Sequence, residues 1–321
     1  MKKEEVCVHE MADPVPLSLG GHTIVGDRPG NEDAYMFKKD INEEGQKTDG
    51  VRRAFAAVFD GHGGSFVSAW MKENLLRAVV TTEEFKNDDY KGALIAGFMN
   101  CDAELQKTNA AECKTCGTCA LACMIVNNTA HFVNSGDCRA LLLGTEKDEQ
   151  ITEDHDPRNP AEKERLEKLG GTIVYKYKKT GCLCFKSEKE DKKQPARVMP
   201  GKLAVTRSIG DFGVKAKHDP ILIIPDPEYY CIELGPTTFN SIVMASDGIW
   251  GEGGGAVKNN DASNLVKGAM AVWDPKEEKG TSRADAGAKT LVEKAYKDAG
   301  LRNVSCDNTT VVVIANKDVA K

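Results

Sequence analysis

The chain has 321 residues, of which 40% are hydrophobic, and its formal net charge is −6. A chain of this size can bury one large core, and no Pro/Gly linker divides it, so we predict a single domain over residues 1–321. The absence of a basic stripe argues against a nucleic-acid partner, and the absence of any long apolar run argues against a signal peptide and membrane insertion.

Apolar runs and helical patterns cluster along the chain instead of alternating strictly. Strands are predicted at 54–59, 120–126, 131–133, 203–205, 221–224, 229–234, 241–245 and 309–315. Helices are predicted at 65–82, 88–107, 160–169 and 284–299. This order favours a layered α+β fold over a doubly wound sheet.

Two segments differ from the rest of the chain. Residues 175–195 are dense in charge and carry few apolar side chains, so they cannot offset the entropy of joining a core. We predict an exposed, mobile insertion there. Residues 251–255 contain four glycines and one glutamate, which indicates a flexible loop directly after an acidic strand end.

Five short acidic signatures occur along the chain, and four of them adjoin strand-like apolar runs. Their carboxylates are Glu32, Asp60, Asp137, Asp247 and Asp307. If those strands are neighbours, several negative charges share one cleft, and each raises the pKa of the others unless a cation neutralises them. Ligands that are all oxygen select hard divalent ions, Mg²⁺ or Mn²⁺, over zinc or copper.

The eleven cysteines are an odd number without secretory context, which indicates reduced thiols in the cytoplasm or nucleus. Cys113, Cys116 and Cys119 have the spacing of a zinc site, and a redox switch is a second alternative. The cysteines that could supply a fourth zinc ligand are Cys101, Cys123, Cys182 and Cys184. We favour the third interpretation, small thiols packed in the core.

Seven ordered motifs carry a resemblance to a known family. They are RPGNEDA (28–34), FDGHGG (59–64), NSGDCRA (134–140), TEDHDP (152–157), LAVTRSIGD (203–211), ASDGIW (245–250) and DNTT (307–310). Through them the chain resembles the metal-dependent serine/threonine phosphatases of the protein phosphatase 2C type. The resemblance implies a central β-sandwich of two antiparallel sheets flanked by helical layers, an α-β-β-α architecture.

The resemblance also implies an activity. It is the hydrolysis of phosphoserine and phosphothreonine in proteins by a water that bridges two metals, Mg²⁺ or Mn²⁺. The implied metal ligands are Glu32, Asp60, the carbonyl of Gly61, Asp247 and Asp307. Phosphoprotein substrates follow from it, and we expect a monomer. The alternative is a pseudophosphatase that binds partners with the same fold, but the matched ligands and His62 are all present, which argues against it.

Two further residues take catalytic roles by the same resemblance. Arg28 matches the phosphate-binding arginine, and a guanidinium can hold two phosphoryl oxygens in one plane. His62 matches the general acid that protonates the departing serine or threonine oxygen. Four other polar residues of the motifs are expected to hold loops and strands in place: Asp33, His155, Arg207 and Asp211.

One position departs from the family pattern. The family commonly has an aspartate after the tryptophan of its Ser-Asp-Gly-x-Trp motif, but here Trp250 is followed by Gly251. In the family that aspartate helps to hold a weaker third metal, with residues matching Asp137 and Asp247. We therefore expect two tight metals and a third site that is weak or relocated, with Glu252 as a possible substitute ligand.

Overall fold

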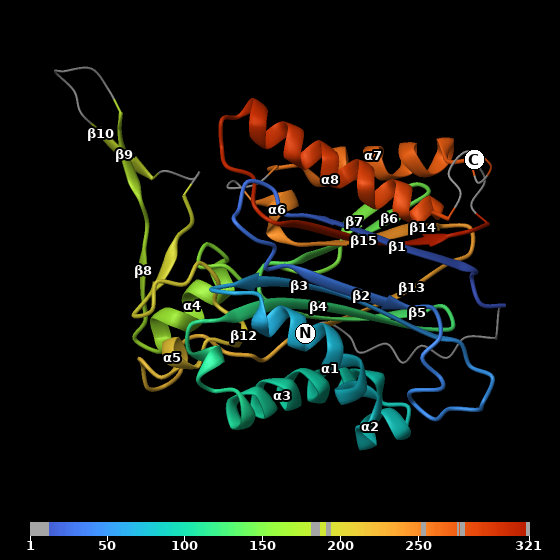
Figure 1. The fold of residues 1–321 in the computed structure, drawn as a ribbon, viewed down its shortest axis with the longest axis horizontal. Coiled ribbons are helices and arrows are strands. Elements are labelled where there is room, and N and C mark those ends of the chain that lie inside the picture. The colour runs from blue at the N-terminus through green and yellow to red at the C-terminus, as the bar shows by residue number, and fades with distance from the viewer. Residues whose placement is uncertain are drawn as a thin grey trace.

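The computed structural model of the chain describes residues 13–180, 187–190, 194–251, 255–274, 276 and 280–318. Two antiparallel sheets lie face to face, and helices cover the outer side of each (Figure 1). The α-β-β-α architecture and the α+β class are therefore confirmed. Among the helices that the structure describes, none combines the length and apolar composition of a membrane-spanning segment.

The first sheet has the strand order β1-β15-β14-β6-β7. Its strands are β1 (Leu17–Ile24), β15 (Thr309–Asn316), β14 (Phe239–Ala245), β6 (Arg139–Gly144) and β7 (Asp148–Gln150). Helices α7 (Asn259–Val272) and α8 (Arg283–Leu301) cover its outer face (Figure 1). Helix α8 begins at a capping box in which Ser282 and Asp285 exchange hydrogen bonds, so its first free amides are satisfied.

The second sheet has the order β13-β5-β4-β3-β2, and a short strand β12 also pairs with β4. Its strands are β13 (Glu228–Glu233), β5 (Thr129–Ser135), β4 (Gly117–Val126), β3 (Arg53–His62), β2 (Ala34–Lys38) and β12 (Ile209–Gly210). Helices α1 (Phe66–Val80), α2 (Glu83–Lys86) and α3 (Tyr90–Thr108) lie on its outer face (Figure 1).

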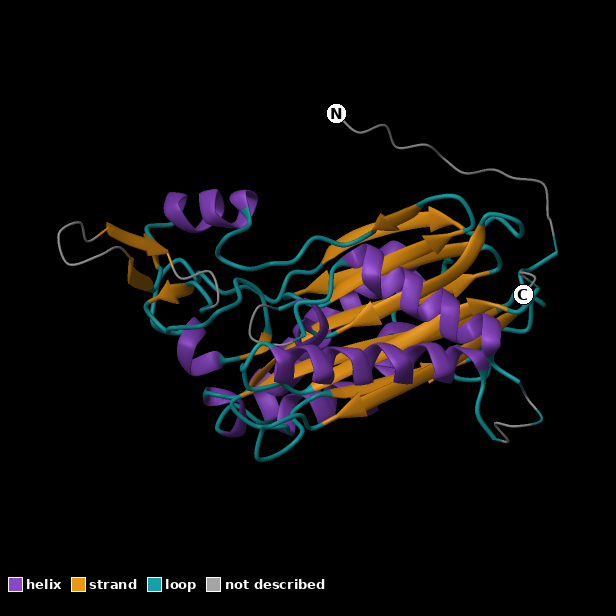
Figure 2. Ribbon diagram, turned by 90° about the horizontal axis from the view of Figure 1, so that it is seen from above, coloured by secondary structure: helices purple, strands orange, loops and turns teal. Residues whose placement is uncertain are grey.

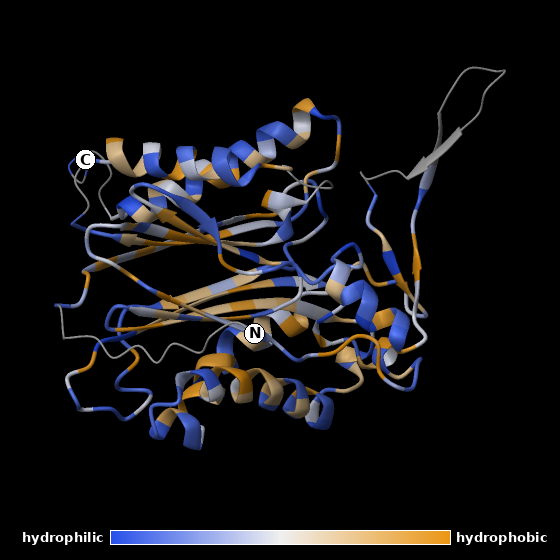
Figure 3. Ribbon diagram, turned by 180° about the vertical axis from the view of Figure 1, so that it is seen from behind, coloured by the Kyte–Doolittle hydropathy of each residue, from blue (hydrophilic) through white to orange (hydrophobic). Residues whose placement is uncertain are grey.

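Strand β3 shows why the apolar runs of the sequence are continuous. Its side chains alternate between two faces. Phe55 and Phe59 pack against helices α1 and α3 on the outer face of the second sheet, whereas Ala56 and Val58 pack between the two sheets. Because both faces are buried, polar alternation is lost. Figure 3 shows the hydrophobic residues gathered along the strands between the layers.

All four predicted helices are confirmed, but two of the predicted strands are wrong. Residues 203–205 and 221–224 contribute only isolated bridges, at Leu203 and Ile224. Leu222 and Ile223 instead fill a small separate core beneath α4 (Pro160–Lys168). Their hydrophobicity therefore reflects burial under a helix, which periodicity cannot distinguish from burial in a sheet.

The insertion predicted at 175–195 contains structure. Strands β9 (Tyr177–Thr180) and β10 (Ser187–Glu190) form an antiparallel pair. The sequence predicts an exposed, mobile insertion but not these two strands, whose backbones hydrogen-bond to each other. Figures 1 and 2 show the pair extending away from the sheets. It is reached through β8 (Thr172–Val174) and β11 (Arg197–Met199), and residues 181–186 and 191–193 lie outside the described residues.

Candidate metal and phosphate site

The five acidic signatures meet at one end of the sandwich. In the second sheet, Ala34 at the start of β2 pairs with Phe59, and Ala120 pairs with both Phe59 and Ser135. In the first sheet, Ala245 pairs with Val311. These registers bring the ends of the strands that carry Glu32, Asp60, Asp137, Asp247 and Asp307 to the same edge. The two short helices near it are α5 (Phe212–Lys215) and α6 (Asp247–Trp250).

Direct contacts join the two sheets at this edge. The backbone N–H of Asp247 donates to Asp60 Oδ2 at 3.2 Å. The backbone N–H of Glu32 donates to Asn308 Oδ1 at 2.8 Å, and the amide nitrogen of Asn308 donates to the carbonyl of Gly30 at 2.9 Å. The loop before β2 is therefore fixed to the segment before β15.

Glycine is required at position 61 by close packing. A Cβ at Gly61 would collide with the carbonyl oxygen of Glu32. The backbone of the predicted carbonyl ligand can therefore lie directly against that of Glu32, a predicted carboxylate ligand, only because no side chain intervenes.

Asp33 anchors the loop before β2 to the ends of β14 and β15. Its Oδ2 accepts hydrogen bonds from Ser246 Oγ at 2.9 Å and Thr310 Oγ1 at 2.7 Å. Its Oδ1 is buried without a partner among the described residues. Burial, with the nearby charges of Asp247 and Asp307, raises the pKa of Asp33 to about 7 despite these hydrogen bonds. These contacts fit the loop-anchoring role expected for it.

The carboxylates repel one another. Burial raises the pKa of Asp60 well above its usual value, and the charges of Asp33, Asp247 and Asp137 raise it further. Burial and Asp247 raise the pKa of Asp137, and burial and Asp307 raise the pKa of Asp247 to about 6. Ionising all of them at neutral pH costs free energy unless a cation is bound.

This electrostatic arrangement fits a hard divalent cation. In the described part of the chain, no three His, Cys, Asp or Glu side chains converge closely enough to hold an ion by themselves. The predicted ligand set does not depend on such a cage, because it includes the carbonyl of Gly61 and water. Mg²⁺ in particular keeps several waters and takes only one or two carboxylates directly.

Arg28 lies at the rim of this cluster. Its Nη2 is 2.5 Å from Asp307 Oδ2, and the arginine side chain is 51% exposed. The guanidinium is thus placed beside a predicted metal ligand with much of its surface open to solvent. The geometry agrees with a group that could meet a phosphoryl oxygen arriving at the cluster.

His62 is the last residue of β3, and its partner is Asp211. His62 Nε2 is 2.6 Å from Asp211 Oδ2, and that oxygen also accepts from Ser208 Oγ at 2.7 Å. Burial opposes protonation of His62, but the charge and hydrogen bond of Asp211 outweigh it, so its pKa is raised. The His62 side chain is 28% exposed, so part of the ring is open to solvent.

Several supports of this histidine were not found from the sequence. A Cβ at Gly117 would collide with the carboxylate of Asp211, so a glycine there admits the His62–Asp211 pair. Asp102 on α3 accepts from the backbone N–H of Gly210 at 2.8 Å and from Lys215 Nζ at 2.9 Å. The sequence signal for Asp102 is a carboxylate on the otherwise buried face of a helix.

His155 and Arg207 have the structural surroundings expected for them. His155 Nδ1 accepts from the backbone N–H of Gly136 at 3.2 Å. Arg207 Nη2 pairs with Glu162 Oε1 at 2.7 Å and Glu228 Oε1 at 2.8 Å. These bonds hold the loops behind the site together.

Within the described residues, the cysteine cluster does not have the convergent thiols of a zinc site. Cys113 and Cys116 pack on the helical side of the second sheet, whereas Cys119 packs between the sheets. All three are buried, and the thiol of Cys119 lies on the opposite side of the sheet from those of Cys113 and Cys116. Burial raises the pKa of Cys113 to about 12 and that of Cys119 well above its usual value, which disfavours a reactive thiolate. The interpretation as packed thiols fits these surroundings.

Gly251 lies against the metal cluster. Its backbone N–H donates to the carbonyl of Asp247 at 2.5 Å. A Cβ there would lie 2.8 Å from that carbonyl oxygen and 3.3 Å from Asp247 Oδ2, so an aspartate at this position would require the backbone to shift. Glu252, the possible substitute ligand, lies outside the described residues. The weak third metal site stays a prediction.

Comparison with known proteins agrees with this geometry. The sequence model described as Protein phosphatase 2C matches residues 17–303. Protein phosphatase 1A of Homo sapiens is 30% identical in an alignment over 283 residues that covers 84% of this chain and 64% of that protein. Probable protein phosphatase 2C 11 of Arabidopsis thaliana is 28% identical over 301 residues, covering 94% of this chain and 67% of that one.

Solved structures share the fold. The crystal structure of serine-threonine phosphatase 2C from Toxoplasma gondii has a TM-score of 0.70 at 19% identity, covering 97% of this chain and 99% of that chain. The layered architecture and the sequence match place this chain among proteins that share a phosphatase fold built on two packed β-sheets. The chain belongs to the protein phosphatase 2C family, as the seven motifs indicate. It spans 64% of the length of human Protein phosphatase 1A.

Proposed function

We propose that this chain is a protein phosphatase that hydrolyses phosphoserine and phosphothreonine with Mg²⁺ or Mn²⁺ as its cofactor. The observation that carries the proposal is the cluster of buried carboxylates with raised pKa values, which lies beside Arg28 and His62. A binding protein of the same fold would have no need of such a costly cluster. This favours the enzyme over the pseudophosphatase.

The chain's own residues have separate tasks in this proposal. Glu32, Asp60, the carbonyl of Gly61, Asp247 and Asp307 would hold two metals. When bound, these ions supply an activated water and stabilise the charge on the phosphoryl oxygens. Asp33 and Asn308 fix the ligand-bearing loops to the ends of β14 and β15.

Arg28 and His62 complete the site. Arg28 would bind two phosphoryl oxygens and orient the ester. His62, held by Asp211, would donate its proton to the serine or threonine oxygen as that oxygen leaves. A serine alkoxide is strongly basic, so protonation during departure lowers the barrier. The monomeric state and the cytoplasmic or nuclear location stay predictions from the sequence.

The test measures phosphate released from a phosphoserine peptide at saturating Mn²⁺. The wild type should turn the peptide over, and Arg28→Ala should raise KM about tenfold, because a hydrogen bond to a charged group contributes about 1.5–3 kcal/mol. Arg28→Lys should recover part of the loss, since lysine keeps the charge but not the planar geometry. Saturating Mn²⁺ is needed because Arg28 also contacts Asp307.

The control is Arg77→Ala, which removes an exposed arginine on α1 that is not among the predicted site residues. No phosphate release by the wild type would contradict the proposed function. Release with an unchanged KM in Arg28→Ala would contradict only the role of Arg28.

A further inference from the structure

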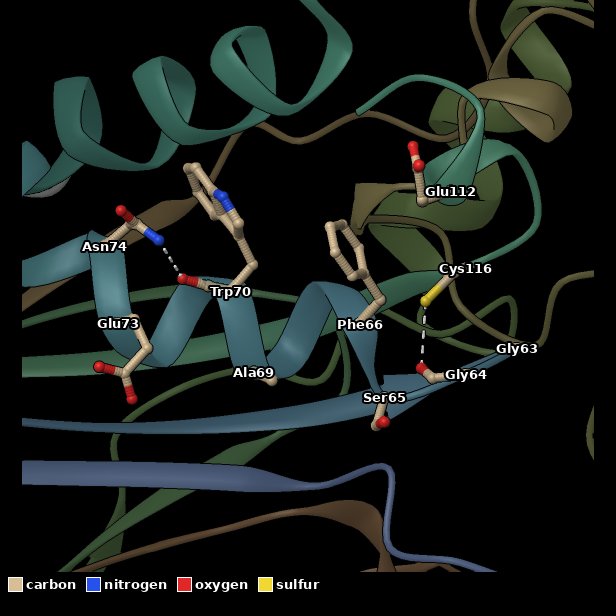
Figure 4. A pocket seen from close by; sticks show the side chains of 10 residues that line it. All are labelled: Gly63, Gly64, Ser65, Phe66, Ala69, Trp70, Glu73, Asn74, Glu112 and Cys116. Atoms are coloured by element: carbon tan, nitrogen blue, oxygen red, sulfur yellow. Dashed lines mark hydrogen bonds between the residues drawn. The ribbon is translucent and has the colours of Figure 1, made fainter. Parts of the chain in front are cut away.

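A groove begins where the segment carrying His62 ends. Its volume is about 670 Å³. Figure 4 shows its lining, which consists of Gly63, Gly64, Ser65, Phe66, Ala69, Trp70, Glu73, Asn74, Glu112 and Cys116. Half of these residues come from the first turns of α1. Neither the metal cluster nor the phosphate-binding role of Arg28 accounts for this surface.

Two aromatic side chains form the apolar part of the groove. Phe66 is 38% exposed, although it is a large hydrophobic residue at the start of a helix. Trp70, one turn further along α1, is only partly buried. Figure 4 shows both rings standing on the same side of the helix. Exposed aromatic surface in a concave place favours a binding role, because covering it removes apolar area from water.

The charged part of the groove is acidic. Figure 4 shows Glu112 across from Phe66, and Glu73 further along α1. Within the residues that the structure describes, neither Glu73 nor Glu112 forms an ion pair, and both are exposed. The groove therefore carries two exposed carboxylates without an ion-pair partner among the described residues. A lysine or arginine of a partner would complement them.

The groove is held in a fixed position relative to His62. Gly63 follows His62 directly, and a Cβ at Gly63 would collide with the carbonyl oxygen of Thr115. The thiol of Cys116 donates to the carbonyl of Gly64 at 3.1 Å. The start of the groove is thus tied to the segment after the short 3₁₀ turn η1 (Glu112–Lys114).

The length of the groove matches a short extended peptide. From Ser65 to Glu73, the helix rises about 12 Å at about 1.5 Å per residue. An extended chain covers that distance with three to four residues, at about 3.3–3.6 Å each. A peptide whose phosphorylated residue lies beside His62, just before Ser65, would therefore place about its fourth neighbour near Glu73.

We propose that this groove binds the segment beside the phosphorylated residue of a protein substrate and selects its sequence. A large apolar side chain one or two residues away packs on Phe66 and Trp70. A lysine or arginine about four residues away lies near Glu73, at the far end of the groove, and in the negative field of Glu112, which lies across from Phe66. This inference rests on the proposed phosphatase function and adds a preference for apolar and basic neighbours.

The test compares phosphoserine peptides with p-nitrophenyl phosphate, which has no neighbouring residues. One peptide carries leucine two residues and arginine four residues from the phosphoserine, on both sides, and a second has glutamate in place of each arginine. For each protein, the readout is the kcat/KM for a peptide divided by that for p-nitrophenyl phosphate. In Phe66→Ala and in the double variant Glu73→Gln/Glu112→Gln, this ratio should fall about tenfold for the arginine peptide.

Matched controls are available on the same protein. Leu301→Ala removes a 75% exposed leucine on α8, and Glu104→Gln removes an exposed glutamate on α3 outside the groove. Both should keep the wild-type ratio. Charge reversal by Glu112→Lys should shift the preference from the arginine peptide toward the glutamate peptide.

The outcomes separate the two proposals. Unchanged ratios in the groove variants, or no shift of preference in Glu112→Lys, would overturn the groove while leaving phosphatase activity established. A wild type that hydrolyses neither the peptides nor p-nitrophenyl phosphate would overturn the proposed function, and the groove with it.

Discussion

Asp60→Asn should lower kcat for a phosphoserine peptide by on the order of a thousandfold at saturating Mn²⁺, because it removes charge from the residues that would hold the metals. Asp247→Asn should behave similarly. The backbone N–H of Asp247 donates to Asp60 Oδ2 at 3.2 Å, so the two positions belong to one cluster. The measurement is steady-state phosphate release by each variant and by the wild type.

The same substitution should leave the fold intact. Since burial and neighbouring charges raise the pKa of Asp60, a neutral amide of the same shape relieves repulsion in the metal-free protein. The melting temperature in chelator should therefore equal or exceed that of the wild type. Asp261→Asn, on the exposed start of α7, is the control and should change neither quantity. A lower melting temperature in chelator with activity retained would show that Asp60 is structural.

His62→Gln should lower kcat for phosphoserine about a hundredfold, the lower range for loss of a general acid. The loss should be much smaller for an aryl phosphate, whose phenolate leaves without a proton. His218→Gln, a histidine outside the site, is the control. Equal losses on both substrates would contradict the general-acid role.

Asp211→Asn provides a second test of His62 as the proton donor. Asp211 raises the pKa of His62, so the protonated form persists to higher pH in the wild type than it would without this partner. Removing the charge should move the basic limb of the kcat profile to lower pH for phosphoserine. An unmoved limb in this variant would separate Asp211 from the proton donor.

The sequence predicts well those strands whose buried residues form one continuous apolar run. Strand β3 and strand β15 are continuous apolar runs, because both of their faces are covered. Strand β1 was not predicted, because Gly20 and Gly21 interrupt its pattern. A Cβ at Gly20 would collide with the backbone of Asp285 on α8, so this glycine reflects a contact 265 residues away in the chain.

The residues of the candidate site also divide into those that the sequence indicates and those that only the structure reveals. Its charged residues stand in short motifs that follow or precede strands, so the sequence alone indicates them. Gly117, Asp102 and the exposed Phe66 gain their significance only from packing between distant elements. The zinc alternative also needs the structure, since spacing along the chain does not show that Cys116, just before β4, and Cys119, on β4, face opposite sides of the sheet.

The measurement that tests the central claim most directly is phosphate release from a phosphoserine peptide before and after metal is removed. Chelator-treated protein should release phosphate at the background rate, because the ions supply the activated water. Adding Mn²⁺ or Mg²⁺ back should restore turnover in the wild type but not in Asp60→Asn. A near-normal rate in chelator would contradict the claim that the buried carboxylates form a catalytic metal site.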